Sequence, residues 1–256
     1  MGQIVSIHSF RGGTGKSNVT ANLAAQVALA DKRVGIVDTD IQSPGIHVLF
    51  GLDENNMGNT LNDFLHEKCS IREVAFPIGE SAGQHAQLVG RPLWLFPASI
   101  RGREISQILR EGFDVNLLNT GLQTLMSEFD LDYLFIDTHP GLNEETLLSI
   151  AISDLLIVIL RPDNQDFQGT AVTVDIARSL DVPNLQLMVN KAVPGHDFEY
   201  LREQIESAYN APLTGILPLN FDLADNASKA LFTLSNPGHP WSRELSKVTE
   251  AVLSVH

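Results

Sequence analysis

A glycine-rich segment near the start of the chain has the residue types that bind phosphate groups. It reads Phe10-Arg11-Gly12-Gly13-Thr14-Gly15-Lys16-Ser17. The apolar run before it predicts a strand and the pattern after it predicts a helix, so backbone N–H groups converge on one anion site. At this spacing, Lys16 is expected to contact the β- and γ-phosphates of a nucleotide, and the Ser17 hydroxyl to ligate Mg²⁺. The segment therefore predicts a nucleotide site.

Acidic side chains follow two other apolar runs. Asp38 and Asp40 come directly after the run 34–37, and Asp137 follows the run 133–136. Two carboxylates two positions apart at a strand end both face the phosphates only where the strand has given way to a loop. The alternative is that Asp38 and Asp40 cap the next turn, as aspartates at such junctions often do.

These segments together resemble the ParA/MinD family of ATPases, whose deviant phosphate loop has the pattern Lys-Gly-Gly-x-Gly-Lys-Ser/Thr. The chain departs from that pattern in carrying Arg11 at the family's signature lysine, and Phe10 stands where the usual phosphate loop has glycine. The later motifs follow in the family's order, so the resemblance covers nearly the whole chain. It implies ATP and Mg²⁺ as cofactors and ATP hydrolysis as the activity.

The resemblance also implies roles in hydrolysis for individual residues. Asp40 is expected to orient the attacking water, with Lys16 and Arg11 as the other catalytic residues. The implied metal site consists of Ser17, Asp38 and Asp137. His139 is expected to be a switch residue near the site and not a catalytic base, because phosphoryl transfer depends mainly on positioning and charge neutralisation.

Further residues are implied to bind the nucleotide itself. Gly141 is expected to offer its N–H to the γ-phosphate and so to sense hydrolysis. Asn190 is expected to contact the adenine edge, and the loop that contains Pro218 is expected to pack over the base. The implied residues of the phosphate loop are Gly12, Gly13, Thr14, Gly15, Lys16, Ser17 and Asn18.

Arg11 is the residue that could connect the nucleotide site to a second subunit. In the family, the signature lysine reaches across an ATP-dependent homodimer to the partner's phosphates. Arginine can hold phosphate oxygens in a bidentate fork, so Arg11 is expected to serve in the same way. The alternative is that Arg11 points into solvent or contacts only its own subunit, which leaves a weak or silent ATPase.

Apolar runs alternate with amphipathic stretches along the whole chain, which predicts an α/β fold with a mostly parallel twisted sheet and helices on both faces. The expected strands are Ile4–His8, Val34–Val37, Leu93–Pro97, Tyr133–Ile136, Leu155–Leu160, Leu185–Val189 and Thr214–Leu217. The expected helices are Ser17–Ala30, Thr60–His66, Glu104–Phe129, Glu144–Ile152, Gln168–Leu180, Phe198–Tyr209 and Asp222–Leu231. Residues 53–90 are otherwise hard to assign.

Composition narrows the class of protein. The 256 residues are 43% hydrophobic, which predicts a single domain over residues 1–256. The formal net charge of −14 opposes generic attraction to nucleic acid or anionic lipid. Cys69 is the only cysteine, which excludes an intrachain disulfide and favours a reducing cytoplasm. The first residues do not resemble a signal peptide, and no stretch approaches the roughly 20 apolar residues that span a bilayer.

The motifs leave three hypotheses for function. The first is a dimerisation switch that binds ATP, engages a protein partner that stimulates hydrolysis or is positioned, and takes part in placing a cargo, a cell-division component or a flagellar component. The second is a nucleotide-dependent scaffold with little hydrolysis, and the third is an ATP-dependent metabolic ligase.

Residues 241–253 have apolar residues at helical spacing and mixed charges on the opposite face. This pattern predicts a helix packed on the domain and not a membrane anchor.

Overall fold

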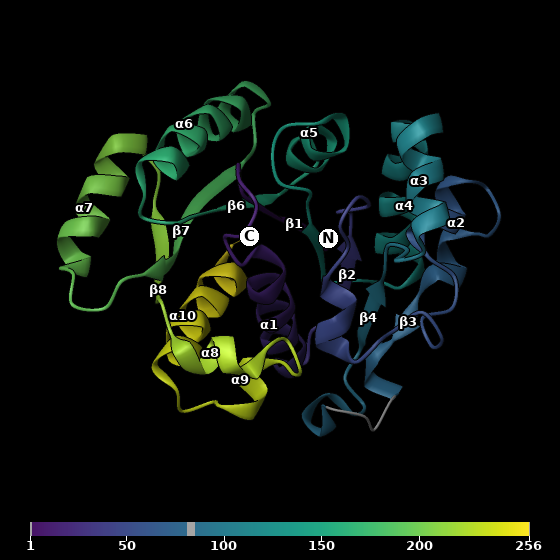
Figure 1. The fold of residues 1–256 in the computed structure, drawn as a ribbon, viewed down its shortest axis with the longest axis horizontal. Coiled ribbons are helices and arrows are strands. Elements are labelled where there is room, and N and C mark those ends of the chain that lie inside the picture. The colour runs from purple at the N-terminus through teal and green to yellow at the C-terminus, as the bar shows by residue number, and fades with distance from the viewer. Residues whose placement is uncertain (1, 81–84, 256) are drawn as a thin grey trace.

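The short apolar runs form the middle of one eight-stranded sheet. The computed structural model describes residues 2–80 and 85–255. The strands are β1 (Gln3–His8), β2 (Val34–Asp38), β3 (Phe76–Pro77), β4 (Leu93–Phe96), β5 (Tyr133–Asp137), β6 (Leu155–Leu160), β7 (Asn184–Ala192) and β8 (Leu213–Pro218). They lie in the order β3-β4-β2-β5-β1-β6-β7-β8 (Figure 1), parallel except for β3. The predicted mostly parallel α/β fold is confirmed.

Helices cover both faces of the sheet, as predicted (Figure 1). The α-helices are α1 (Lys16–Leu29), α2 (Leu61–Leu65), α3 (Gly102–Glu111), α4 (Val115–Glu128), α5 (Glu144–Ala151), α6 (Asn164–Ser179), α7 (Phe198–Tyr209), α8 (Phe221–Asn226), α9 (Phe232–Ser235) and α10 (Pro240–Ser254). Shorter 3₁₀ turns occupy Ile46–Phe50, Ile71–Val74, Ile78–Glu80 and Ala86–Leu88. Side chains alternate between the faces: Val5 and Ile7 of β1 join the core beneath α1 and α10, whereas Ile4 joins the core beneath α4.

The register of the central strands brings the acidic residues to one edge. Ile7 pairs with Asp137 across β1 and β5, and Asp38 pairs with Asp137 across β2 and β5. Because all three strands are parallel, their carboxyl ends meet where the glycine-rich loop leaves β1. This is the edge at which open α/β sheets bind ligands.

Two of the predicted helices are shorter than expected. The predicted helix 104–129 is two helices, α3 and α4, because Gly112 adopts a left-handed φ of +69° and Asp114 caps α4. In α3, Leu109 is 58% exposed, whereas the neighbouring Ile108 is buried. The predicted helix 222–231 ends at Asn226, where Ala227 turns to a positive φ of +47°.

The segment 53–90 contains local structure with identifiable causes. The predicted helix at 60–66 is α2, and Thr60 caps it through a reciprocal pair of hydrogen bonds with Asp63. Beyond it, β3 adds an antiparallel edge to the sheet, which the sequence did not predict. Residues 81–84 of the segment lie outside the described residues.

The last helix packs on the body of the domain, as its pattern predicted. Trp241, Leu245 and Val248 of α10 are fully buried in the same core as α1. The Trp241 and Phe232 rings are nearly perpendicular, with their centroids 5.7 Å apart. No helix among the described residues is both long and apolar enough to cross a membrane.

We expect Trp241→Ala to lower the free energy of unfolding by about 3–5 kcal/mol, because it removes a fully buried ring from the core. Urea unfolding followed by circular dichroism measures this change. Phe221→Ala is the matched control, since Phe221 is 82% exposed and its loss should cost less than about 0.5 kcal/mol. Equal effects of the two substitutions would show that α10 contributes nothing specific to stability.

Candidate nucleotide site

The glycine-rich loop joins the end of β1 to the start of α1 and encloses a cavity. Gly13 and Gly15 have φ values of +79° and +89°, a region that glycine enters without steric cost. Gly15 is the N-cap of α1, so the N–H groups of the helix's first turn open onto the loop. The cavity has a volume of about 280 Å³ and is lined by Ser9, Gly12, Gly13, Thr14, Gly15, Lys16, Ser17, Asn18, Asp40, Ser43 and Pro140. The structure thus brings together all the loop residues that the sequence singled out.

Lys16, which lines this cavity, belongs to a buried ion pair. Lys16 Nζ donates to Asp137 Oδ1 over 2.8 Å, and the two side chains are only 7% and 1% exposed. The Thr20 hydroxyl donates to the same oxygen over 3.3 Å. Asp137 Oδ2 is buried and has no protein partner among the described residues. One carboxylate oxygen therefore holds the lysine and the other is free to accept a ligand.

The neighbouring Asp38 adds a second buried carboxyl group. It accepts hydrogen bonds from the backbone N–H of Asp40 over 3.1 Å and of Gly45 over 3.3 Å. Burial raises the pKa of Asp38 well above its usual value, and the negative charges of Asp137 and Asp40 raise it further. A buried position close to two other carboxylates thus disfavours the negative charge of Asp38.

These oxygens fit Mg²⁺. Magnesium prefers oxygen ligands and usually keeps several waters while it bridges one or two protein groups and the substrate's phosphates. The orphaned Asp137 Oδ2, Asp38 and the Ser17 hydroxyl offer that kind of set. No group of three or more His, Cys, Asp and Glu residues poised to hold a metal occurs in residues 2–80 and 85–255, and a magnesium site of this type does not require one.

Asp40 lines the cavity together with the loop residues. Its Oδ1 accepts hydrogen bonds from the N–H and the hydroxyl of Ser43, over 3.1 and 3.0 Å. Asp38 and Asp40 therefore both cap the turn that follows β2, and Asp40 also faces the cavity. His139 Nε2 lies 3.9 Å from Asp40 Oδ1, while His139 Nδ1 is buried without a partner among the described residues.

The two departures in the loop both contact α6. The Phe10 ring packs on Gly169, where a Cβ atom would lie only 2.1 Å from the ring. The Arg11 guanidinium donates to the Gln165 side chain and lies 3.9 Å from Asp166, which Arg161 also holds. Arg11 thus contacts its own subunit here, although its side chain remains 42% exposed.

Three other predicted residues lie outside the lining of the cavity. The Gly141 N–H donates to the Ser9 carbonyl over 3.3 Å, so in this state it is turned to the protein and not to a phosphate. Pro218 ends β8 next to Ala192 of β7. Asn190 lies behind the loop, where its Nδ2 donates to the Thr14 carbonyl over 2.7 Å.

Sequence reasoning missed several residues of the site. Thr20 and Ser43 are common residue types in a helix and a turn, and nothing in the sequence marks them as part of the site. Lys191, whose Nζ donates to the Gly13 carbonyl, could have been found because it follows Asn190 directly. His8 is fully buried at the end of β1, and its pattern reads as an ordinary strand residue.

His8 is buried, and its side chain has a hydrogen-bond partner, Thr138. Its Nδ1 lies 2.8 Å from the Thr138 hydroxyl, which already donates to the Ile7 carbonyl, so Nδ1 must carry the proton and donate. Nε2 has no partner among the described residues. Burial, with smaller contributions from the charges of Lys16 and His139, lowers the pKa of His8 to about 3.

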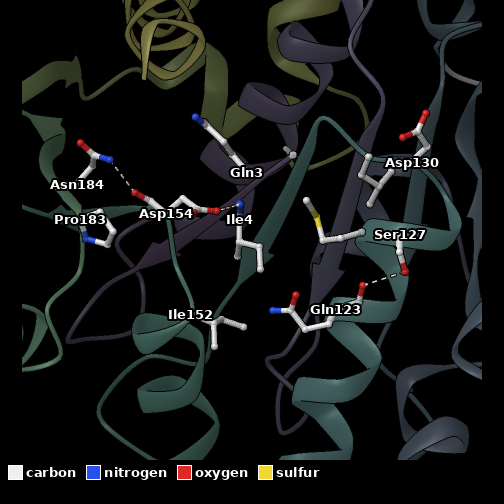
Figure 2. A pocket seen from close by; sticks show the side chains of 12 residues that line it. Gln3, Ile4, Gln123, Ser127, Asp130, Ile152, Asp154, Pro183 and Asn184 are labelled. Carbon is white, nitrogen blue, oxygen red and sulfur yellow. Dashed lines mark hydrogen bonds between the residues drawn. The ribbon is translucent and has the colours of Figure 1, made fainter. Parts of the chain in front are cut away.

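A cavity larger than that of the loop lies at the other edge of the sheet. It has a volume of about 570 Å³ and lies where β1, β6 and β7 begin, beside the end of α4 (Figure 2). Figure 2 shows Gln3, Asp130 and Asp154 among its lining side chains. Its described lining contains two carboxylates and no lysine or arginine, so size alone does not identify the phosphate site.

We expect the free energy of unfolding to fall as the pH decreases from about 6.5 to about 3, in part through His8. In this window the unfolded chain binds a proton on His8 that the folded chain does not, so stability rises with pH and is lost on acidification. Urea unfolding at several pH values, compared between the natural chain and His8→Asn, isolates this effect. Asn retains a donor toward Thr138, and a pH dependence identical in both proteins would contradict the assignment.

The chain matches the family model described as AAA domain over residues 2–189. It is 27% identical over 215 residues to an uncharacterized ATP-binding protein of Methanocaldococcus jannaschii, MJ0547, which covers 84% of this chain and 73% of that protein. It is 26% identical over 240 residues to the iron-sulfur cluster carrier protein of Rickettsia conorii. That match covers 90% of this chain but only 65% of the relative's length.

Solved structures with the same fold include two MinD proteins. The cell division ATPase MinD of Pyrococcus furiosus superposes with a TM-score of 0.83 at 18% identity, with complete coverage of both chains. The septum site-determining protein MinD of Pyrococcus horikoshii, complexed with Mg-ADP, gives 0.79 at 19% identity and covers 99% of this chain and 97% of that one. The resemblance inferred from the motifs is confirmed at the level of fold, and the chain belongs to the AAA domain family of ATP-binding proteins with the ParA/MinD fold.

Proposed function

We propose that the protein is an ATP-binding and slowly hydrolysing dimerisation switch that uses Mg²⁺. The observation that carries this proposal is the loop cavity, which Lys16 and Asp40 both line and in which Lys16 is paired with the buried Asp137. The P. horikoshii MinD complex with Mg-ADP supports the choice of ligand, since it shares the fold.

The residues around the cavity have separate tasks in this mechanism. The loop N–H groups and Lys16 bind the phosphates, and Lys16 must shift part of its bonding from Asp137 to phosphate oxygens when the nucleotide enters. Ser17, Asp38 and Asp137 would hold magnesium, which would neutralise charge that develops on the phosphates. Asp40 orients the attacking water, because its carboxylate lines the cavity and is fixed by Ser43.

The switch acts through a second subunit and a protein partner. Arg11 leaves its own Gln165 and reaches the phosphates bound by the partner subunit. A protein partner then stimulates hydrolysis or is itself positioned in the cytoplasm, as the solved MinC:MinD cell division complex of Aquifex aeolicus and the plasmid partition protein of Borrelia burgdorferi suggest by analogy of fold. The net charge of −14 disfavours nucleic acid as a generic partner.

The Rickettsia relative is named an iron-sulfur cluster carrier protein, which suggests iron–sulfur cluster transfer as an alternative function. Iron–sulfur clusters are held by several thiolates, commonly four. The 256 residues contain one cysteine, Cys69, which is free and half-buried in a turn after α2. We therefore favour the switch over a cluster carrier.

We expect Asp40→Asn to lower kcat for ATP hydrolysis by about 100-fold, because it removes the charge that orients the water while keeping the side chain's size. Affinity for ADP should stay within about threefold, since in this mechanism the loop N–H groups and Lys16 bind the phosphates and Asp40 does not. Steady-state turnover and ADP titration measure the two quantities. A turnover that is very low and the same in both proteins would instead favour a nucleotide-dependent scaffold.

We expect ATP with Mg²⁺, but not ADP, to convert the protein to dimers, and Arg11→Ala to abolish this conversion. Sedimentation velocity of both proteins without nucleotide, with ADP and with ATP provides the test. Arg243→Ala is the charge-matched control, because Arg243 is exposed on α10 and far along the chain from the loop. Dimers that persist in Arg11→Ala would show that the arginine acts only within its own subunit.

A further inference from the structure

Two consecutive side chains of β7 hold two consecutive carbonyl groups of the phosphate loop. Asn190 Nδ2 donates to the Thr14 carbonyl over 2.7 Å, and Lys191 Nζ donates to the Gly13 carbonyl over 2.7 Å. These residues are separated from the loop by more than 170 positions in the sequence. The loop is thus anchored to the β7 side of the sheet as well as to its own helix.

The backbone of Lys191 is bent so that its side chain can reach the loop. Lys191 has a φ of +59°, in the left-handed region that a residue with a Cβ seldom adopts. β7 is irregular at this point, since its register against β8 shifts between Val189 and Ala192. A non-glycine residue in this conformation often reflects a local requirement, and from this conformation the Lys191 side chain reaches Gly13.

The fit between this pair and the loop is close. A Cβ atom added at Gly15 would lie 2.6 Å from Asn190 Nδ2 and 3.8 Å from the Lys191 Cε. Asn190 is 3% exposed, and its Oδ1 accepts the backbone N–H of Lys191 over 2.9 Å. The amide is therefore held on both sides and cannot turn without breaking a contact.

Holding the carbonyl groups fixes the direction of the N–H groups that follow them. A trans peptide unit is planar, and its N–H points opposite to its C=O. The carbonyl of Gly13 shares a plane with the N–H of Thr14, and the carbonyl of Thr14 shares a plane with the N–H of Gly15. Neither N–H meets a protein acceptor among residues 2–80 and 85–255, so both are left for an anion.

We infer that Lys191 and Asn190 are positioning residues that keep the phosphate loop in its anion-binding shape. This inference rests on the proposed function, and it adds that affinity for the phosphates of a nucleotide, more than for its base, depends on the two side chains. Lys191 acts through Gly13 and does not itself need to contact the ligand. Preorganised donors bind more tightly because the cost of ordering them is met in the folded protein.

The test is Lys191→Met, which keeps the Cβ and the length of the side chain but removes the donor. Binding of ADP, inorganic pyrophosphate and adenosine is measured by calorimetry or by competition with a labelled ADP. We expect the affinity for ADP and pyrophosphate to fall about tenfold, the scale of one charge-assisted hydrogen bond, and that for adenosine to stay unchanged. Amide hydrogen exchange in residues 12–16 should become faster in the variant, and Lys191→Arg, which retains a donor, should restore most of the affinity.

Lys229→Met is the matched control, since Lys229 is an exposed lysine in the segment between α8 and α9. Thermal unfolding of all variants separates an effect on the loop from a loss of folding. Equal ADP affinity in Lys191→Met and the natural chain would overturn the inference while leaving the proposed function intact, as would a loss shared equally by adenosine. No binding of ADP by the natural chain would overturn both.

Asn190 provides an independent check on the same inference. Asn190→Leu keeps the shape of the side chain but removes the donor to Thr14, so it should weaken pyrophosphate binding in the same way as Lys191→Met. Unchanged pyrophosphate affinity together with weaker adenosine affinity would instead assign Asn190 to the base and remove it from the positioning pair.

Discussion

The site is organised around one ion pair that the protein has removed from water. Taking an ammonium and a carboxylate into the interior is costly, and removing one partner of such a pair is typically destabilising by about 3–5 kcal/mol. Lys16 and Asp137 come from different elements, α1 and β5, and they meet because β1 and β5 pair in parallel with Ile7 opposite Asp137. The register of the central strands therefore also brings together the charged side chains of the site.

The charges near this pair do not balance. Three carboxyl groups, those of Asp38, Asp40 and Asp137, lie near the single ammonium of Lys16. Burial raises the pKa of Asp38, and the charges of Asp137 and Asp40 raise it further. A divalent cation would correct the deficit of positive charge, but the phosphates of a nucleotide alone would increase it. The arrangement thus favours binding of the nucleotide and magnesium together over binding of the nucleotide alone.

The sequence predicted the central architecture because local patterns and tertiary structure agree there. Strands covered on both faces are apolar throughout, and the glycine-rich loop has a composition that few other structures require. The small edge strand at 76–77 and the break at Gly112 escaped prediction, since a two-residue strand has no periodicity and a lone glycine can also lie within a helix. The roles of His8 and Lys191 depend on contacts between distant segments, which no local pattern records.

Phe10 gives the loop a mechanical connection that a glycine at this position could not make. Its ring lies on Gly169, and its neighbour Arg11 bonds Gln165, so α6 is joined to the loop at two points one helical turn apart. α6 has 16 residues and extends for about 24 Å. A rearrangement of the loop would therefore displace the first turns of α6, and the helix would carry that displacement about 24 Å away from the loop.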